Sequence, residues 1–164
     1  MFFRALLAFL MVPVVVTGVV PFMLAANDPY KGAGNLSGLL LIGIGLTILL
    51  WCVRDFYVSG KGTLAPWDPP KKLVTVGLYR YVRNPMYVGV VFILSGWAVV
   101  TASPIILGFT LFLFMAFYLR VKTHEEPWAE ANFGAEWLAY KSNVPRWLPQ
   151  LKAYKPEEKN LHFR

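Results

Sequence analysis

The stretch GLYRYVRNPMYVGVVFILSGW, residues Gly77–Trp97, joins a cluster of arginine, tyrosine and proline to the start of a long apolar segment. The chain carries no charged residue between Arg83 and Arg120. A helix needs about 20 apolar residues to cross the roughly 30 Å hydrocarbon core of a bilayer. The segment is too long for one such helix and is interrupted at Thr101–Pro104. It therefore predicts two short helices in a tight hairpin.

The rest of the chain extends this membrane pattern. It is 57% hydrophobic and 15% charged, against about 25% charged residues in soluble domains. Two further segments, between Arg4 and Asp28 and between Lys31 and Arg54, are free of charge, and each fits one span. We expect an all-α integral membrane protein with a single domain over residues 1–164 and four transmembrane helices, at about 5–26, 36–57, 85–100 and 104–121.

The positive charges predict how the chain lies in the membrane. The loop Ser59–Asn84 holds five lysines and arginines against one aspartate, and such loops stay in the cytoplasm. Both termini are then cytoplasmic, and the expected location is a bacterial or archaeal cytoplasmic membrane. The net charge of +7 suits anionic lipid headgroups. The sequence contains no basic domain that would bind nucleic acid, so we expect the lipid bilayer to be the partner.

The first apolar segment has one alternative interpretation, a cleaved signal peptide, because Arg4 precedes it and Ala25-Ala26 stand near its end. Its apolar stretch is much longer than the 7–15 residues of a signal-peptide core, which favours a retained helix. Cys52 is the single cysteine and can form no internal disulfide. Two isolated histidines, His124 and His162, are too few for a metal cluster, so we expect no metal.

The start of the third span has the features of an anion site. Pro85 suits the first turn of a helix, with Asn84 as its N-cap. The unpaired N–H groups of that turn, beside Arg80 and Arg83, would attract an anion. We expect the cytoplasmic part of the site to consist of two regions, this one at residues 59–89 and a second one at residues 120–149.

Interfacial anchoring is the alternative interpretation of this start, because tyrosine and arginine are common at headgroup depth. It accounts for Tyr79, Tyr81 and one arginine. It does not account for Tyr87 and Gly89 inside the helix, where we expect Gly89 to make room beside an aromatic ring.

Two adjacent carboxylates, Glu125 and Glu126, follow the fourth span. Carboxylates at membrane depth are costly and usually functional, whereas at the water boundary they would be ordinary charges at a helix start, with Pro127 at its first position. The segment alone leaves both interpretations open.

Aromatic residues at helical spacing, Phe133, Trp137 and Tyr140, predict an amphipathic cytoplasmic helix on the bilayer or over the bundle. This stripe is interpreted as packing rather than as a ligand site. Arg146, after that helix, is a spare cation returning toward the interface.

Taken together, these residues suit S-adenosylmethionine. Its carboxylate suits arginines and helix-start amides, its amino group and ribose suit glutamates, and its sulfonium suits aromatic faces. The sequence shows no Walker loop and no Ser-His or Cys-His arrangement that would indicate another chemistry.

The motifs RYVRNPMYVG and HEEPWAEANFGAEWLAYKSNVPRWLP resemble the isoprenylcysteine carboxyl methyltransferase and phospholipid methyltransferase superfamily. That superfamily has Arg-His-Pro-x-Tyr-x-Gly, a helical hairpin, then Glu-Glu and Phe-Gly-x-x-Tyr-x-x-Tyr. The resemblance covers about Gly60–Pro149. It implies a membrane enzyme that uses S-adenosylmethionine to methylate a lipophilic acceptor entering from the bilayer.

The resemblance and the residues together give a candidate site. The expected catalytic residues are Glu126, Arg146 and Asn84. The expected cofactor-binding residues are Tyr81, Arg83, Asn84, Pro85, Tyr87, Gly89, His124, Glu125 and Glu126. Arg146 would orient an anionic group of the substrate or the cofactor. The chain departs from the superfamily at Asn84, where histidine is common, at Trp137, where tyrosine is common, and at Ala129, where leucine is common.

Methyl transfer is an in-line displacement in which the enzyme positions the reactants and excludes water. A carboxylate acceptor needs no base, whereas an amine or a thiol must lose a proton. Glu125, Glu126 and His124 are the candidates to accept that proton. Isoprenylcysteine carboxyl methylation is the expected activity, with a phospholipid amine or a small thiol as alternatives. The alternative from another class is a non-enzymatic scaffold or transporter subunit.

Overall fold

The computed structural model describes residues 13–59 and 72–156, and all regular structure in this part of the chain is helical. The expected all-α class is confirmed. The expected first span begins at residue 5, so its first eight residues lie outside the described part, as do residues 60–71 of the expected cytoplasmic loop. The elements are η1 (Val15–Val19, a π-helix), α2 (Val20–Asn27), α3 (Gly38–Ser59), η2 (Gly77–Arg80, a 3-10 helix), α4 (Pro85–Thr101), α5 (Pro104–Arg120), η3 (Val121–Glu125, a π-helix) and α6 (Glu126–Asn143).

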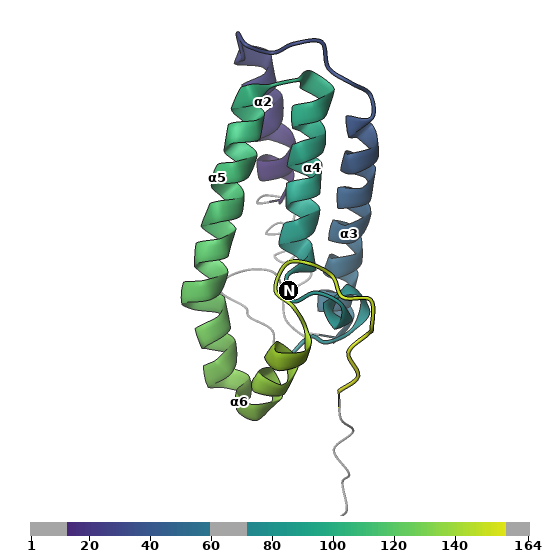
Figure 1. Ribbon diagram of the computed structural model, residues 1–164, viewed down its shortest axis with the longest axis vertical. Helices are drawn as coiled ribbons and strands as arrows, with labels where there is room; N and C mark the ends of the chain where they lie inside the picture. Colours follow the sequence, from purple (N-terminus) through teal and green to yellow (C-terminus); the bar gives the residue numbers. More distant parts are fainter. Residues whose placement is uncertain (1–12, 60–71, 157–164) are drawn as a thin grey trace, which may run out of the picture.

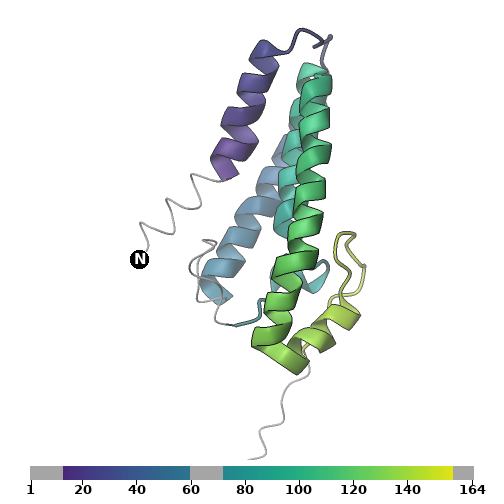
Figure 2. The ribbon, with the colours of Figure 1, turned by 90° about the vertical axis from the view of Figure 1, so that its left-hand side faces the viewer.

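Three long helices, α3, α4 and α5, run along the length of the molecule, with α4 packed between the other two (Figure 1). The short helix α2 lies against α4 and α5 at one end, and α6 turns back from α5 at the other end (Figure 2). The main apolar core is centred on α4, where Ile93 and Leu94 are almost completely buried and pack near Leu49 of α3.

Glycines bring α3 and α4 into close contact. A Cβ added to Gly45 would lie 2.6 Å from the carbonyl oxygen of Gly89, and one added to Gly38 would lie 2.4 Å from that of Gly96. The two pairs are each seven residues apart, so each helix presents both glycines on one face. Small residues allow this approach of helix backbones in membranes. Gly89 therefore serves helix packing, and the expectation that it makes room beside a ring is wrong.

The turn between α4 and α5 is the tight hairpin that the sequence predicts. Ala102 adopts a left-handed conformation with φ +47°, and the Ser103 hydroxyl accepts a hydrogen bond of 3.1 Å from the Ile106 amide. The same hydroxyl donates to Asp28, which lies just after α2. The loop after α2 also pairs with the hairpin, since the Gly32 amide donates to the Ala102 carbonyl at 3.2 Å. The hairpin thus ties α2 to the end of the bundle.

The chain from α5 to α6 does not restart a helix at the two glutamates. It continues through the five-residue π-helix η3, in which the Glu126 amide donates to the Val121 carbonyl. Pro127 lies in the first turn of α6, as expected. The fold differs from the prediction because the wider π turn keeps the helix continuous; Glu126 is buried there and Glu125 is partly exposed. Such turns are frequent at functional sites.

Helix α6 is broken near its middle at Gly134, which has φ +50° and ψ −122°. Beyond the break, Trp137 and Tyr140 are buried and pack with Val144 and the partly buried Leu73. The predicted amphipathic helix is present, and its aromatic stripe covers the segment before α4.

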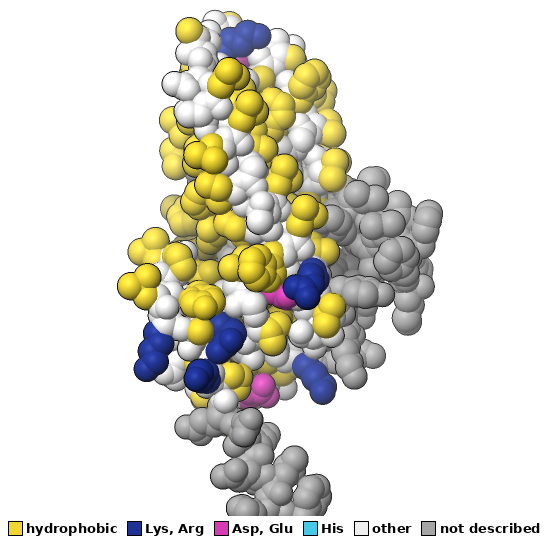
Figure 3. Space-filling view, turned by 90° about the vertical axis from the view of Figure 1, so that its right-hand side faces the viewer, with side chains coloured by type: hydrophobic (Ala, Val, Ile, Leu, Met, Phe, Trp, Pro, Cys, Tyr) yellow, Lys and Arg dark blue, Asp and Glu magenta, His cyan; other side chains and the backbone are white. Residues whose placement is uncertain are grey.

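Two helical stretches in the described part are long and apolar enough to cross a membrane, Gly38–Asp55 and the run Pro104–Asn143. Val15–Asn27 and Pro85–Thr101 are shorter apolar helices. Figure 3 shows one face on which hydrophobic side chains cover the long helices and most lysines and arginines gather near the α6 end. This distribution is that of a protein whose helical bundle lies in lipid and whose α6 end lies at a polar boundary.

Candidate functional site

The candidate site forms where the segment before α4 meets the segment after α6. The Arg83 amide donates to the Pro145 carbonyl at 2.9 Å, and the Gln150 amide donates to the Tyr81 carbonyl at 3.0 Å. These bonds hold two stretches that are about 65 residues apart in sequence side by side. Pro85 starts α4 there and is buried.

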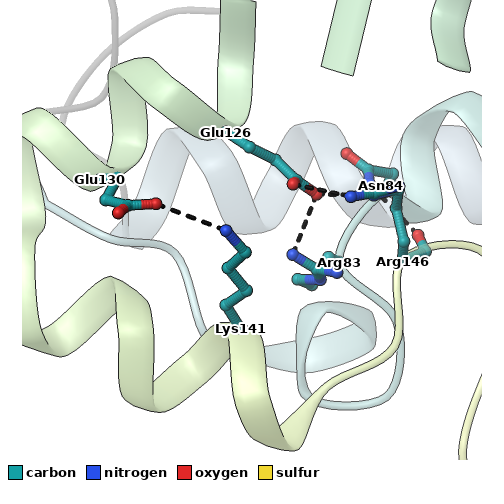
Figure 4. A network of polar contacts seen from close by, with 6 residues as sticks. All are labelled: Arg83, Asn84, Glu126, Glu130, Lys141 and Arg146. Atoms are coloured by element: carbon teal, nitrogen blue, oxygen red, sulfur yellow. Dashed lines mark hydrogen bonds and ion pairs between the residues drawn. The ribbon is translucent and has the colours of Figure 1, made fainter. Parts of the chain in front are cut away.

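Glu126 is the centre of the site, and we call Arg83, Glu126 and Arg146 the arginine–glutamate cluster. Arg146 donates from Nε to Oε1 at 2.7 Å and from Nη2 to Oε2 at 2.8 Å. Arg83 donates from Nη1 to Oε1 at 3.0 Å (Figure 4). The side chains of Glu126 and Arg83 are only 8% and 9% exposed. Because α6 carries Glu126 toward both arginines, the interpretation of Glu126 as an ordinary solvated charge is wrong.

The cluster has two guanidinium groups and one carboxylate, so it carries a net positive charge. Burial lowers the pKa of Arg83, although Glu126 opposes this effect. The hydrogen bonds to Glu126 raise the pKa of Arg146, which is more exposed. Glu126 is therefore fully engaged in accepting hydrogen bonds, and the cluster as a whole favours a further negative group.

Asn84 supports the cluster rather than capping the helix. It occupies the N-cap position of α4, but its side chain makes no capping hydrogen bond. Its Nδ2 instead donates to the Arg146 carbonyl at 3.1 Å. Asn84 therefore holds the predicted N-cap position without the predicted capping bond, and its bond to the Arg146 carbonyl fixes the side chain instead.

A second network lies beside the cluster, around Glu125. The Tyr87 hydroxyl and the Nε of Arg120 both donate to Glu125 Oε1, the latter at 2.9 Å. Glu125 is 36% exposed and Arg120 is 55% exposed, so this network faces solvent. Arg120 was not among the predicted site residues. It could have been suspected because it is the first charged residue after the apolar stretch and lies five residues before Glu125.

Aromatic rings from α4, α5 and the segment after α6 continue the site toward the apolar bundle, and we call them the aromatic group. Tyr87 stacks on Phe117 with ring centroids 4.3 Å apart. The Trp147 ring lies 5.2 Å from that of Phe114 and 6.4 Å from that of Tyr87. The guanidinium carbon of Arg146 lies 5.8 Å from the centre of the Tyr118 ring. The aromatic faces therefore adjoin the charged cluster directly.

The structure brings most of the predicted site residues together, and three lie apart from both networks. Gly89 lies at the α3–α4 contact. His124 is exposed, and its Nδ1 lies 2.6 Å from the Thr123 hydroxyl. Tyr81 contributes its carbonyl to the Gln150 bond. His124 lies within η3 and is exposed, whereas Glu126, two residues later, is buried.

Several buried donors in the site have no acceptor among the described residues. They are Arg83 Nε, Trp137 Nε1 and Trp147 Nε1. Buried polar groups are nearly always paired, so these donors fit a ligand that carries acceptor oxygens or nitrogens. The arginines, the half-exposed Glu125 and the aromatic group also match the carboxylate, amino and sulfonium groups of S-adenosylmethionine. The residues present therefore fit this cofactor.

An all-α bundle with long apolar helices and a charged site at one end defines an integral membrane protein with a ligand site at the membrane boundary. Residues 34–136 match the phospholipid methyltransferase family. The chain belongs to this family of integral membrane methyltransferases.

Individual relatives agree with the family and differ in how much they share. The protein-S-isoprenylcysteine O-methyltransferase of Mus musculus is 38% identical over 86 residues, 52% of this chain and 30% of the relative. That of Homo sapiens is 38% identical over 84 residues, 51% of this chain and 29% of the relative. The cobalt-zinc-cadmium resistance protein CzcN of Cupriavidus metallidurans is 29% identical over 150 residues, 88% of this chain and 64% of the relative. The chain thus spans under a third of the length of the two methyltransferases. No solved structure matches the chain significantly.

Proposed function

We propose that the protein is an S-adenosylmethionine-dependent methyltransferase that acts on a lipophilic acceptor in the membrane, most like isoprenylcysteine carboxyl methylation. The observation that carries the proposal is the arginine–glutamate cluster, buried at one end of an apolar bundle and adjoined by the aromatic group. The family match and the isoprenylcysteine methyltransferases among the relatives support the same activity.

Different residues of the site would bind different groups of S-adenosylmethionine. S-adenosylmethionine, when bound, supplies a methyl group on a positively charged sulfur. Tyr87 and Trp147 offer aromatic faces for that charge. Glu125, which is partly exposed and held by Tyr87 and Arg120, offers a carboxylate for an amino or hydroxyl group. The arginines attract a carboxylate, and Asn84 orients Arg146 through its carbonyl.

The engagement of Glu126 bears on the acceptor. Its two oxygens accept three hydrogen bonds from arginines, so taking a proton would cost those charge-assisted bonds. A carboxylate acceptor needs no base and would approach a net positive cluster. We therefore favour a carboxylate acceptor, such as the C-terminal carboxylate of a lipid-modified cysteine.

A phospholipid amine is the second candidate, because the family model that matches the chain is that of phospholipid methyltransferases. An amine must lose a proton. Glu125, whose side chain is 36% exposed, is the carboxylate of the site that could accept it. A small thiol would make the same demand on Glu125.

The membrane arrangement is part of the proposal. We propose four spans, with both termini and the site at the cytoplasmic face; the two long apolar stretches and the two shorter apolar helices support the number of spans. Tyr87 lies in the first turn of α4, and Phe114 and Phe117 lie in the last two turns of α5. An acceptor entering sideways from the bilayer would meet these rings first.

The test is calorimetric titration of the purified protein in detergent with S-adenosylhomocysteine. We expect the wild type to bind, and Glu125→Gln and Glu126→Gln to bind at least about tenfold more weakly, since the first loses a carboxylate offered to the cofactor and the second loses the bonds that position Arg83 and Arg146. Glu130→Gln is the matched control, because Glu130 is 49% exposed and pairs with Lys141 on the surface of α6. Failure of the folded wild type to bind would favour the scaffold alternative, and equal binding by all four proteins would contradict the placement of the cofactor at Glu125 and Glu126.

A further inference from the structure

Two buried hydrogen-bond donors from neighbouring side chains lack an acceptor at the α6 side of the cluster. Arg83 Nε and Trp137 Nε1 have no partner among the described residues. The Arg83 side chain is 9% exposed and Trp137 is 7% exposed. The guanidinium carbon of Arg83 lies 5.7 Å from the centre of the Trp137 ring. Because an unmet buried donor is costly, two of them on neighbouring side chains indicate a missing acceptor.

The charges around Arg83 indicate what kind of acceptor is missing. Within residues 13–59 and 72–156, Glu126 is the one carboxylate that contacts Arg83, and Arg146 shares it. Tyr140, also beside Arg83, uses its hydroxyl to donate to the Tyr79 carbonyl at 2.7 Å. One carboxylate shared by two guanidinium groups leaves a net positive charge beside Arg83, and burial lowers the pKa of Arg83. A neutral acceptor would satisfy the donors but leave this charge, whereas an anion satisfies both.

Trp137 has a packing role as well, since it lies in the apolar cluster with Ala129, Tyr140 and Val144. Packing explains the position of its ring, and a phenylalanine would fill that role. It does not explain an indole N–H that is buried beside an under-neutralised guanidinium without a partner.

We propose that Arg83 Nε and Trp137 Nε1 together bind the carboxylate at the amino-acid end of S-adenosylmethionine. This inference rests on the proposed function and assigns one end of the cofactor. One carboxylate oxygen accepts from each donor, and the carboxylate supplies the negative charge that the cluster lacks. Trp137 is then a cofactor-binding residue, and the cluster orients the cofactor with its sulfur toward the aromatic group.

The test compares two ligands that differ in the carboxylate alone. S-adenosylhomocysteine carries it, and S-adenosyl-3-thiopropylamine is the same thioether with the amino group but without the carboxylate. Both are titrated into the full-length wild type and Trp137→Phe, which keeps an aromatic ring and removes the N–H. Trp128→Phe is the control, since Trp128 lies on the same helix, is 37% exposed and packs edge-on against Phe133.

We expect the wild type to prefer S-adenosylhomocysteine, and Trp137→Phe to bind it about tenfold more weakly, as for one lost hydrogen bond to a charged group. The affinity of Trp137→Phe for the thiopropylamine, and of Trp128→Phe for both ligands, stays within about twofold of wild type. Unchanged binding of S-adenosylhomocysteine by Trp137→Phe, or an equal loss for both ligands, would overturn this inference while the proposed function stands. A folded wild type that binds neither ligand would overturn both.

Discussion

Arg146 makes a bidentate contact with Glu126, which lies 20 residues earlier at the other end of α6. A straight helix of 18 residues would hold its ends about 27 Å apart, so this contact requires the chain to turn back. The turn lies at Gly134, and the Lys141–Glu130 contact at 3.4 Å brings its two arms together (Figure 4). The break in α6 is therefore what assembles the arginine–glutamate cluster.

Replacing Gly134 with alanine should disturb this assembly. The φ of +50° with ψ −122° is a conformation that alanine adopts only with strain, although no atom lies within 4 Å of the added Cβ. We expect Gly134→Ala to lower the free energy of unfolding by about 1–3 kcal/mol and to weaken S-adenosylhomocysteine binding. Denaturant unfolding and titration in detergent measure the two effects.

The control for Gly134→Ala is Gly108→Ala in α5. Gly108 also has open space around its Cβ, but it lies within a regular helix. Its replacement should be neutral or stabilise by up to about 1 kcal/mol. Equal effects of the two substitutions would contradict a specific role for the break.

Replacing Glu126 with glutamine should destabilise the fold itself. It leaves two guanidinium groups, one of them 9% exposed, without a countercharge. Removing one partner of a buried ion pair costs about 3 kcal/mol, and we expect a loss of that size in denaturant unfolding. Glu130→Gln, whose side chain is 49% exposed, should change stability by less than about 0.5 kcal/mol. If the two variants were equally stable, Glu126 would not be the electrostatic centre of the site.

The close contact of α3 and α4 gives a second pair of matched substitutions. A Cβ at Gly45 would meet the Gly89 carbonyl at 2.6 Å, whereas one at Gly43 meets nothing within 4 Å. We expect Gly45→Ala to destabilise the bundle by about 1–3 kcal/mol through overpacking, and Gly43→Ala to leave it unchanged. Thermal unfolding in detergent compares them, and a larger loss for Gly43→Ala would show that the helices pack on another face.

The stability that the Asp28–Ser103 contact gives, at the end of the bundle opposite α6, should depend on pH. Burial raises the pKa of Asp28, but hydrogen bonds from the Ser103 hydroxyl and the Tyr30 and Ile105 amides, with the charge of Lys31, outweigh it and leave the pKa below 3.8. A lowered pKa means that the ionised form stabilises the folded state above the ordinary pKa, and that this stability is lost as the pH falls through the lowered value.

Asp28→Asn removes this titration. We expect the wild type to have the higher melting temperature at about pH 6, and the difference between the two proteins to shrink toward about pH 3. Melting curves at several pH values measure it. A difference that stays constant over this range would show that Asp28 contributes by shape alone.

The sequence predicted those parts of the molecule that depend on local pattern. The charge-free segments predicted the apolar helices, and the interruption at Thr101–Pro104 predicted the hairpin. Both signals are local, because Pro104 and the Ser103 cap act within one turn of α5. Arg83, Asn84, Tyr87, Glu125, Glu126 and Arg146 do gather at one place, as the spacing and the resemblance led us to expect.

The sequence could not predict how these residues divide into two networks. That division depends on η3, whose wider turn directs Glu125 toward Tyr87 and Glu126 toward the arginines. A π turn has no clear sequence signal. The break at Gly134 was equally hidden, since one glycine within a helical pattern is usually tolerated. Arg120 and the donor on Trp137 were missed for this reason, because their partners are set by the path of the chain.

The central claim, methyl transfer to a lipophilic acceptor, is tested most directly with S-adenosylmethionine carrying a radiolabelled methyl group. Purified protein is incubated with a lipid extract, or with an S-farnesylated cysteine derivative or phosphatidylethanolamine as defined acceptors. The account predicts label in the organic phase with wild type, most strongly with the farnesylated carboxylate, and little with Glu126→Gln. If folded wild type binds S-adenosylhomocysteine but all lipid products stay unlabelled, methyl transfer to a lipophilic acceptor is contradicted.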